Sequence, residues 1–88
     1  MQKYLAEFLG TLFLVYVILA TGNPLAIGAA LAIGIFLSAG VSGGHLNPVV
    51  SVVMAAKGRL ETTDLIPYII AQLSGALIAL EIYKKWKP

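Results

Sequence analysis

The 88-residue chain contains no cysteine, which excludes disulfide bonds and thiolate metal sites. Its one histidine and four scattered carboxylates leave little material for a metal centre or a catalytic cluster. The sequence also has no nucleotide-binding motif and no pairing of a nucleophile with a base. We therefore expect neither an enzyme nor a cofactor, and nothing in the sequence indicates a nucleic-acid partner.

Charge is scarce as well. Charged residues make up 11% of the chain and hydrophobic residues 59%, more apolar surface than a soluble domain of this size could bury. Three apolar stretches approach the about 20 residues that a bilayer crossing needs. They are residues 4–21, 25–41 and 65–83. No small-residue cleavage site follows the first stretch, so a signal peptide is not expected. The sequence predicts a multi-pass integral protein of the cell or inner membrane.

A polar loop interrupts this apolar pattern between the second and third stretches. Residues 42–51 read Ser-Gly-Gly-His-Leu-Asn-Pro-Val-Val-Ser. Asn47 suits a helix N-cap and Pro48 the first helical position. The apolar run that follows, residues 48–56, is too short to cross a bilayer. Irregular backbone at membrane depth is tolerated only where protein buries it or where it lines a watery cavity. We therefore expect a re-entrant loop and half-helix at about residues 42–57, marking a pore or binding site.

The ends and faces of the helices carry further signals. Gly58 suits the position just after the half-helix, and Thr62, Thr63 and Asp64 are candidate N-caps of the third span. Small residues recur every four positions, which lets helices approach closely in lipid, although such residues are common in membrane spans anyway. These series are Ala6 and Gly10; Ala26, Ala30, Gly34 and Ser38; and Ala71, Gly75 and Ala79. The aromatic residues Tyr4, Tyr68, Tyr83 and Trp86 lie near span ends, as in an interfacial belt.

The loop resembles that of the aquaporin and aquaglyceroporin family, whose signature is Ser-Gly-x-His-x-Asn-Pro-Ala. Residues 6–11, Ala-Glu-Phe-Leu-Gly-Thr, are similar to the family's first-helix motif. Residues 70–76, Ile-Ala-Gln-Leu-Ser-Gly-Ala, are similar to its third-helix motif. The resemblance covers nearly the whole chain but only one half of the family's fold, because a full member joins two inverted halves. It implies an all-α membrane fold with three transmembrane helices and one re-entrant half-helix, a single half-repeat over residues 1–88.

A single half-helix reaches only mid-membrane, so a continuous pore needs a second one. With three spans the termini lie on opposite faces, and the positive-inside bias that fixes orientation is absent. One face would carry Lys3, Lys57 and Arg59, and the other Lys84, Lys85 and Lys87. A chain without this bias can insert in both orientations. Two copies could then pair as an antiparallel homodimer, or four dimers could form an eight-chain assembly. The alternative is a truncated fragment of a longer gene whose lysine-rich tail is incidental.

The resemblance also assigns roles to residues. Asn47 would donate to a single-file solute at mid-membrane, where the half-helix N-terminus repels cations and protons. The backbone carbonyls of Gly43, Gly44 and His45 would be further solute contacts.

Three side chains are expected to support the loop: Glu7, Gln72 and His45. The alternatives are ion or proton binding for Glu7 and Gln72, and solute contact or pH gating for His45. Leu14 and Leu31 complete the expected pore lining.

Three positions depart from the family pattern. Val49 replaces the alanine of Asn-Pro-Ala at the contact between facing half-helices. Val50 stands where the family's second half has the filter arginine, and Ile27 stands at the filter's aromatic position. In a symmetric dimer, Ile27 and Val50 of both chains would form one apolar constriction. A ring without arginine puts a water-only filter in doubt and favours small uncharged solutes such as glycerol.

The sequence thus predicts a passive channel for water, small uncharged solutes or both, with the lipid bilayer and a second copy as partners. Two alternatives remain open. The first is a structural or regulatory membrane subunit, or a fragment, that requires a full-length partner. The second is a weakly selective ion channel, permitted by the missing arginine.

Overall fold

The computed structural model describes residues 1–87, so only the last residue of the predicted repeat lies outside it. Within these residues there are four helices and no strand: α1 (Gln2–Thr21), α2 (Pro24–Ser42), α3 (Pro48–Ala56) and α4 (Thr62–Lys85). Helices α1, α2 and α4 are long and apolar enough to cross a membrane. With 9 residues, α3 is not. The predicted all-α class and three spans are confirmed.

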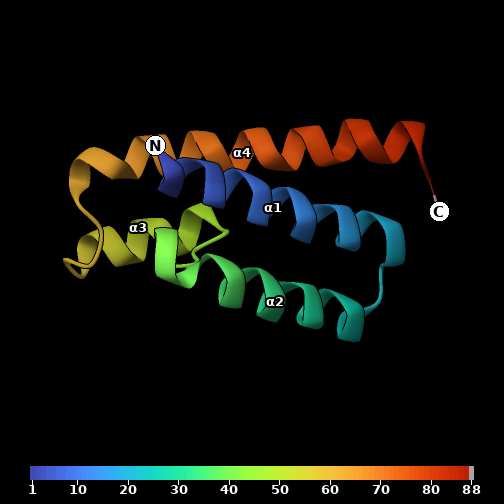
Figure 1. The fold of residues 1–88 in the computed structure, drawn as a ribbon, viewed down its shortest axis with the longest axis horizontal. Helices are drawn as coiled ribbons and strands as arrows, with labels where there is room; N and C mark the ends of the chain where they lie inside the picture. Colours follow the sequence, from blue (N-terminus) through green and yellow to red (C-terminus); the bar gives the residue numbers. More distant parts are fainter. Residues whose placement is uncertain (88) are drawn as a thin grey trace.

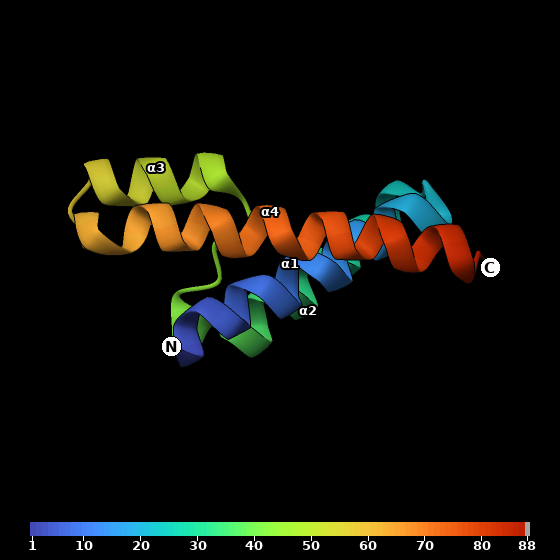
Figure 2. The same ribbon diagram turned by 90° about the horizontal axis from the view of Figure 1, so that it is seen from above.

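Helix α1 lies between α4 and α2 and packs against both (Figure 1). Among the described helices, α3 packs against α4 alone, beside the first half of that helix (Figure 2). The N-terminus and the α3–α4 connection lie at one end of the molecule, while the C-terminus and the α1–α2 turn lie at the other (Figure 1). The two sets of three cationic residues therefore occupy opposite ends, as the charge count assumed.

Two asparagines begin the helices that start with proline. Asn23 Oδ1 accepts from the backbone N–H groups of Leu25 and Ala26 at 2.9 and 3.0 Å. Asn47 Oδ1 accepts from Val49 N at 2.9 Å, which confirms the predicted cap of α3. This helix ends at Ala56 with Lys57 as its C-cap, and Gly58 follows with a φ of +84°, as predicted for the position after the C-cap.

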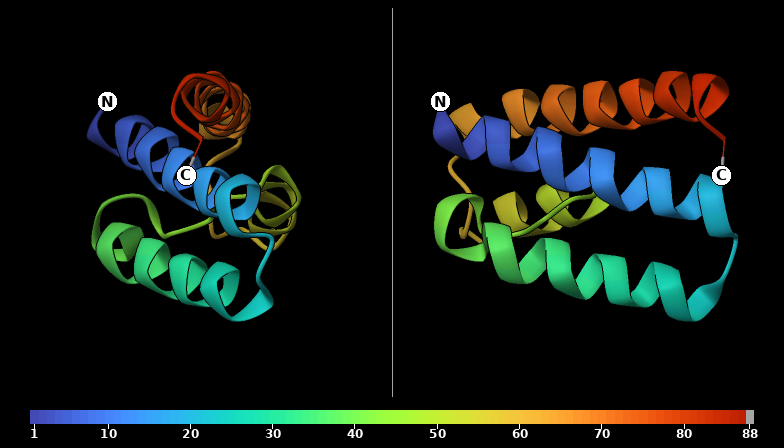
Figure 3. Two further views of the ribbon diagram at one scale, coloured as in Figure 1. Left: turned by 90° about the vertical axis from the view of Figure 1, so that its right-hand side faces the viewer. Right: turned by 45° about the vertical axis from the view of Figure 1, so that its right-hand side comes forward.

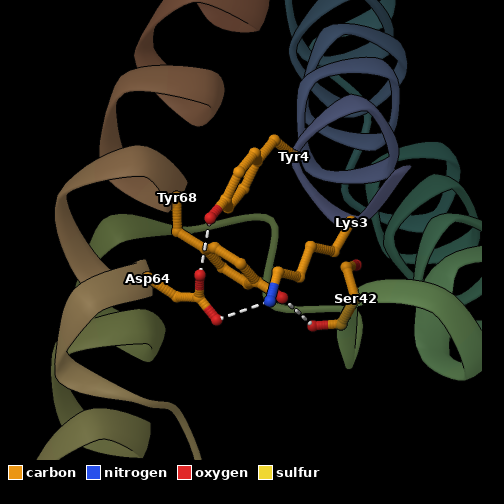
Figure 4. Close-up of polar contacts among 5 residues, drawn as sticks. All are labelled: Lys3, Tyr4, Ser42, Asp64 and Tyr68. Atoms are coloured by element: carbon orange, nitrogen blue, oxygen red, sulfur yellow. Dashed lines mark hydrogen bonds and ion pairs between the residues drawn. The ribbon is translucent and has the colours of Figure 1, made fainter. Parts of the chain in front are cut away.

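The predicted capping of α4 is wrong. The N-cap position is Glu61, which makes no side-chain cap bond, and the helix already includes Thr62. Asp64 instead faces α1, where its carboxylate accepts from Lys3 Nζ at 2.8 Å and from Tyr4 OH at 2.6 Å (Figure 4). A charged donor on a neighbouring helix offers this carboxylate a stronger bond than its own backbone does.

The small-residue seams hold the helices together. Gly75 of α4 lies against the backbone of α1, where an added Cβ would be 3.2 Å from Leu12 N and closer still to the Phe8 carbonyl oxygen. Ala79, one turn further on, is fully buried. Along α2, the buried members of the series are Ala30, Gly34 and Ser38. The every-fourth-residue pattern therefore marks real contact lines in α2 and α4.

Candidate functional site

The loop between α2 and α3 turns back from the end of α2 to the centre of the molecule, where α3 begins (Figure 3). Gly43 and Gly44 open this turn with φ angles of +90° and +66°, which glycine adopts without strain. A Cβ on Gly44 would lie 3.1 Å from the carbonyl oxygen of Ile35. The loop therefore runs directly along α2, and only glycine fits at position 44, where the loop backbone touches the backbone of Ile35.

Glu7 of α1 binds this loop with both carboxylate oxygens, and its side chain is fully buried. Oε1 accepts from the backbone N–H of Leu46 at 2.7 Å and from Gln72 Nε2 at 2.9 Å. Oε2 accepts from the backbone N–H of His45 at 3.0 Å and from Ser42 Oγ at 2.6 Å. Two loop amides, the end of α2 and α4 thus meet on one carboxylate.

Gln72 and Ser51 extend the network to the start of α3. Gln72 Nε2 donates both to Glu7 and to Ser51 Oγ, the latter at 2.9 Å. Ser51 Oγ also lies 2.8 Å from His45 Nδ1. The amide of Gln72 uses both protons in these bonds, so the serine hydroxyl is free to donate its own proton to His45 Nδ1.

Sequence reasoning missed Ser51. Its only signal was its place one helical turn after Asn47, on the face that turns toward α4. The structure does bring together the three side chains expected to support the loop: Gln72 bonds to Glu7 directly and to His45 through Ser51. No group of three or more His, Asp or Glu side chains in residues 1–87 is arranged to hold a metal ion.

The belt interpretation of Tyr68 is wrong. Its side chain is only 2% exposed and its hydroxyl donates to the carbonyl oxygen of Ser42 at 2.8 Å (Figure 4). The ring also packs against His45, with centroids 5.2 Å apart. The end of α2 has carbonyls without helical partners, and the Tyr68 hydroxyl satisfies one of them beneath the loop. Trp86, in contrast, is 67% exposed near the C-terminal end.

Asn47 lies on the open side of this network. Asn47 is exposed to solvent. Its Oδ1 atom accepts the cap bond, which leaves Nδ2 with two protons to donate. Val49 beside it is 68% exposed. Of the residues whose carbonyls were expected to face solutes, Gly43 is exposed while Gly44 and His45 are buried.

The candidate constriction residues do not meet within one chain. Ile27 is in the first turn of α2, and the start of this helix lies at the end of the molecule that carries the C-terminus (Figure 1). Val50 is in the first turn of α3, which runs from the centre of the molecule toward the opposite end. Leu14 and Ile27 are half-buried, and Leu31 is 39% exposed. The expectation of one ring containing both residue types therefore needs revision, because the two positions lie on different sides of the centre.

Comparison with known proteins decides the family. The family model named Major intrinsic protein matches residues 1–88. The chain belongs to the major intrinsic protein family. It is 46% identical to the glycerol uptake facilitator protein-like 6 of Lactiplantibacillus plantarum, over 98% of this chain and 44% of that protein.

Two proteins named aquaporin Z give similar matches within this family. The chain is 37% identical to that of Bradyrhizobium diazoefficiens, over 93% of the chain and 40% of the relative. It is 41% identical to that of Brucella melitensis biotype 1, over 93% and 42%. The chain thus spans less than half the length of these curated relatives. Family membership and three long apolar helices make it an integral, multi-pass membrane protein.

Proposed function

We propose that this chain forms a passive membrane channel for water and small uncharged solutes, in which two antiparallel copies each supply one half-helix. The observation that carries the proposal is the position of Asn47. It caps a 9-residue helix that begins at the centre of the molecule (Figure 3). Asn47 is exposed, and the loop that precedes it is hydrogen-bonded to Glu7. Asn47 and its half-helix would form one half of a pore lining, on a face of the chain that is exposed in the single copy.

A polar loop and an exposed amide cannot face lipid at mid-membrane, because each unpaired polar group there costs several kcal/mol. A second half-repeat would cover this face and leave a water-filled path between the two half-helices. The balanced charges at the two ends allow the chain to insert in either orientation. A second copy turned over in the membrane would therefore supply the second half-helix.

The solute would pass the two Asn47 amides in single file. Each amide donates hydrogen bonds, and the backbone carbonyls of Gly43, Gly44 and His45 would accept them. The N-terminal ends of both half-helices carry a partial positive charge of about +0.5 each. Cations and protons would therefore be repelled at the centre, while water and alcohol hydroxyls satisfy both donors and acceptors.

The network behind Asn47 would act as loop support. Four donors surround the carboxylate of Glu7, and neither of its oxygens is left free to take part in proton transfer. This arrangement favours a supporting role for Glu7 and Gln72 over ion or proton binding. His45 would likewise support the half-helix, through its bond to Ser51.

In an antiparallel dimer the pore would have two constrictions. A two-fold axis in the membrane plane exchanges the two ends of the molecule, so Ile27 of one copy would lie on the same side of the centre as Val50 of the other copy. Leu31, one turn after Ile27, would line the same wall, with Leu14 as a further candidate. Each ring would be apolar and would lack arginine, which suits small uncharged solutes.

The test is transport by the chain alone. Proteoliposomes that contain only the purified chain are shrunk by sucrose or by glycerol gradients and followed by stopped-flow light scattering. We expect faster water flux than in empty vesicles, measurable glycerol flux and background conductance in planar bilayers. Val50→Trp, which would fill both constrictions, should abolish flux while the protein remains dimeric by size exclusion.

Other outcomes would support other functions. A folded chain that transports nothing alone but co-purifies with a full-length channel would be a subunit. Cation conductance above background would indicate an ion channel. Reporters fused to the C-terminus should appear on both membrane faces, and a single fixed orientation would contradict the antiparallel model.

A further inference from the structure

Leu46 stands between His45 and Asn47, and its side chain is only 2% exposed. Its φ of +55° lies in the left-handed region, which a leucine does not favour by itself. Among the described residues it is the only non-glycine residue with a positive φ. Such a conformation persists only where the surroundings hold it, so the contacts of Leu46 need an explanation.

Two glycines on different helices make room for this side chain. A Cβ added to Gly34 of α2 would lie 2.8 Å from Cδ1 of Leu46, and one added to Gly10 of α1 would lie 2.5 Å from Cδ2. Both separations are too short for real carbon–carbon contacts. Gly10 and Gly34 therefore form a socket at the α1–α2 crossing, and the two methyl groups of Leu46 fill it.

We propose that Leu46 is a positioning residue, which fixes the place of Asn47 relative to α1 and α2. The backbone N–H of Leu46 bonds to Glu7 while its side chain occupies the socket, so two independent attachments hold this one residue. Asn47 follows after one peptide bond, and within residues 1–87 its side chain bonds to α3 alone, through the backbone N–H of Val49. The hydrogen bond from Leu46 N–H to Glu7 would by itself still allow the loop backbone to rotate about that bond. The contact of the Leu46 side chain with Gly10 and Gly34 prevents this rotation.

This inference rests on the proposed function only in that Asn47 meets the solute; the position of Asn47 can be measured without transport. The chain contains two asparagines, Asn23 and Asn47, and both are helix N-caps. Their side-chain amide resonances in a ¹⁵N-labelled sample therefore report on one site each. Asn23, at the far end of α2, serves as the internal reference.

The experiment combines variants that alter the fit. Gly34→Ala should displace Leu46 and shift the Asn47 amide resonance, with Asn23 unchanged. In the double variant with Leu46→Ala the clash is gone, and the new methyl group at position 34 takes the space that Leu46 Cδ1 has left, so the Asn47 resonance should return toward its wild-type position. Gly40→Ala is the matched control on the same helix, because its added Cβ would meet nothing within 4 Å. It should move neither resonance.

Transport distinguishes positioning from simple packing. Flux per folded channel should fall in Gly34→Ala and recover in the double variant. If Gly34→Ala lowers only the melting temperature, with resonance and flux per folded channel unchanged, the inference is wrong. If the wild type transports nothing while the Asn47 resonance moves and recovers as stated, the positioning role stands and the proposed channel fails.

If Gly34→Ala does not fold, two further variants test whether Leu46 positions Asn47. Leu46→Ala empties the socket without a clash and must move the Asn47 resonance. Leu46→Met refills it with a flexible apolar side chain and must bring the resonance back. An unmoved resonance in a folded Leu46→Ala variant would overturn the inference.

Discussion

Glu7 of α1 and Gln72 of α4 are joined by a hydrogen bond of 2.9 Å between Oε1 and Nε2, with both side chains almost wholly buried. Each of them also contacts the loop–half-helix segment, Glu7 through backbone amides and Gln72 through Ser51. The two helices and the loop are thus connected at one point. Changes at this point should affect the fold before they affect selectivity.

Glu7→Gln tests this connection. The substitution replaces one acceptor oxygen with an NH₂ group that must face donors already in place, whichever way the amide turns. Each buried group left unpaired costs about 1–3 kcal/mol. We expect a large loss of melting temperature by circular dichroism in detergent. The control is Glu81→Gln, an exposed residue whose bond to Lys84 is 3.3 Å long, and it should melt like the wild type.

Ser51→Ala removes the hydroxyl that connects Gln72 with His45. Two buried polar groups lose a partner, so unfolding should be easier by about 1–3 kcal/mol. Ser74→Ala is the matched control, because Ser74 is exposed on α4. Chemical denaturation of both purified variants checks this difference. Equal stability of the two would show that Ser51 is not part of the support.

Tyr68→Phe keeps the ring against His45 but removes the bond to the Ser42 carbonyl. The expected loss is about 0.5–1.5 kcal/mol of unfolding free energy. Tyr83→Phe, near the end of α4, should have no measurable effect. If both variants behave alike in the same denaturation assay, Tyr68 acts as an interfacial residue after all.

The sequence was sufficient for the spans, for the half-helix and for its Asn47 cap, because apolar length and the Asn-Pro pair are local signals. It did not predict the partners of Asp64, Tyr68 or Ser51. Their spacing along the chain is ordinary, and their roles depend on which helix packs opposite them. Asp64 looked like a cap because the lysine that binds it is 61 residues away.

The sequence also did not predict how deep in the membrane each pore residue lies. A count of residues from Asn47 places Ile27 and Val50 at family filter positions, but it does not tell on which side of the centre each lies. The direction of α2 and α3 decides this. Leu46 was similarly hidden, because the small-residue series indicated helix seams and not a socket for a loop side chain.

Val50→Arg follows from the revised geometry. In the proposed dimer it would place one guanidinium in each of two separate constrictions, and not two in a single ring. A narrow charged ring favours water over larger uncharged solutes, so the ratio of glycerol flux to water flux should fall. Val50→Leu adds bulk without charge and serves as the control. An unchanged ratio in a folded Val50→Arg channel would place the filter elsewhere.

The antiparallel pair of half-helices is the central claim, and disulfide cross-linking of single-cysteine variants tests it most directly, since the chain has no native cysteine. Val49→Cys would lie at mid-membrane beside the two-fold axis, and Trp86→Cys would lie near the C-terminal end. The account predicts that oxidation in vesicles links two Val49→Cys chains in a dimer that still conducts water, while Trp86→Cys chains remain unlinked within the dimer. Efficient linkage through position 86, with Val49→Cys remaining monomeric, would show parallel or unrelated chains and contradict the account.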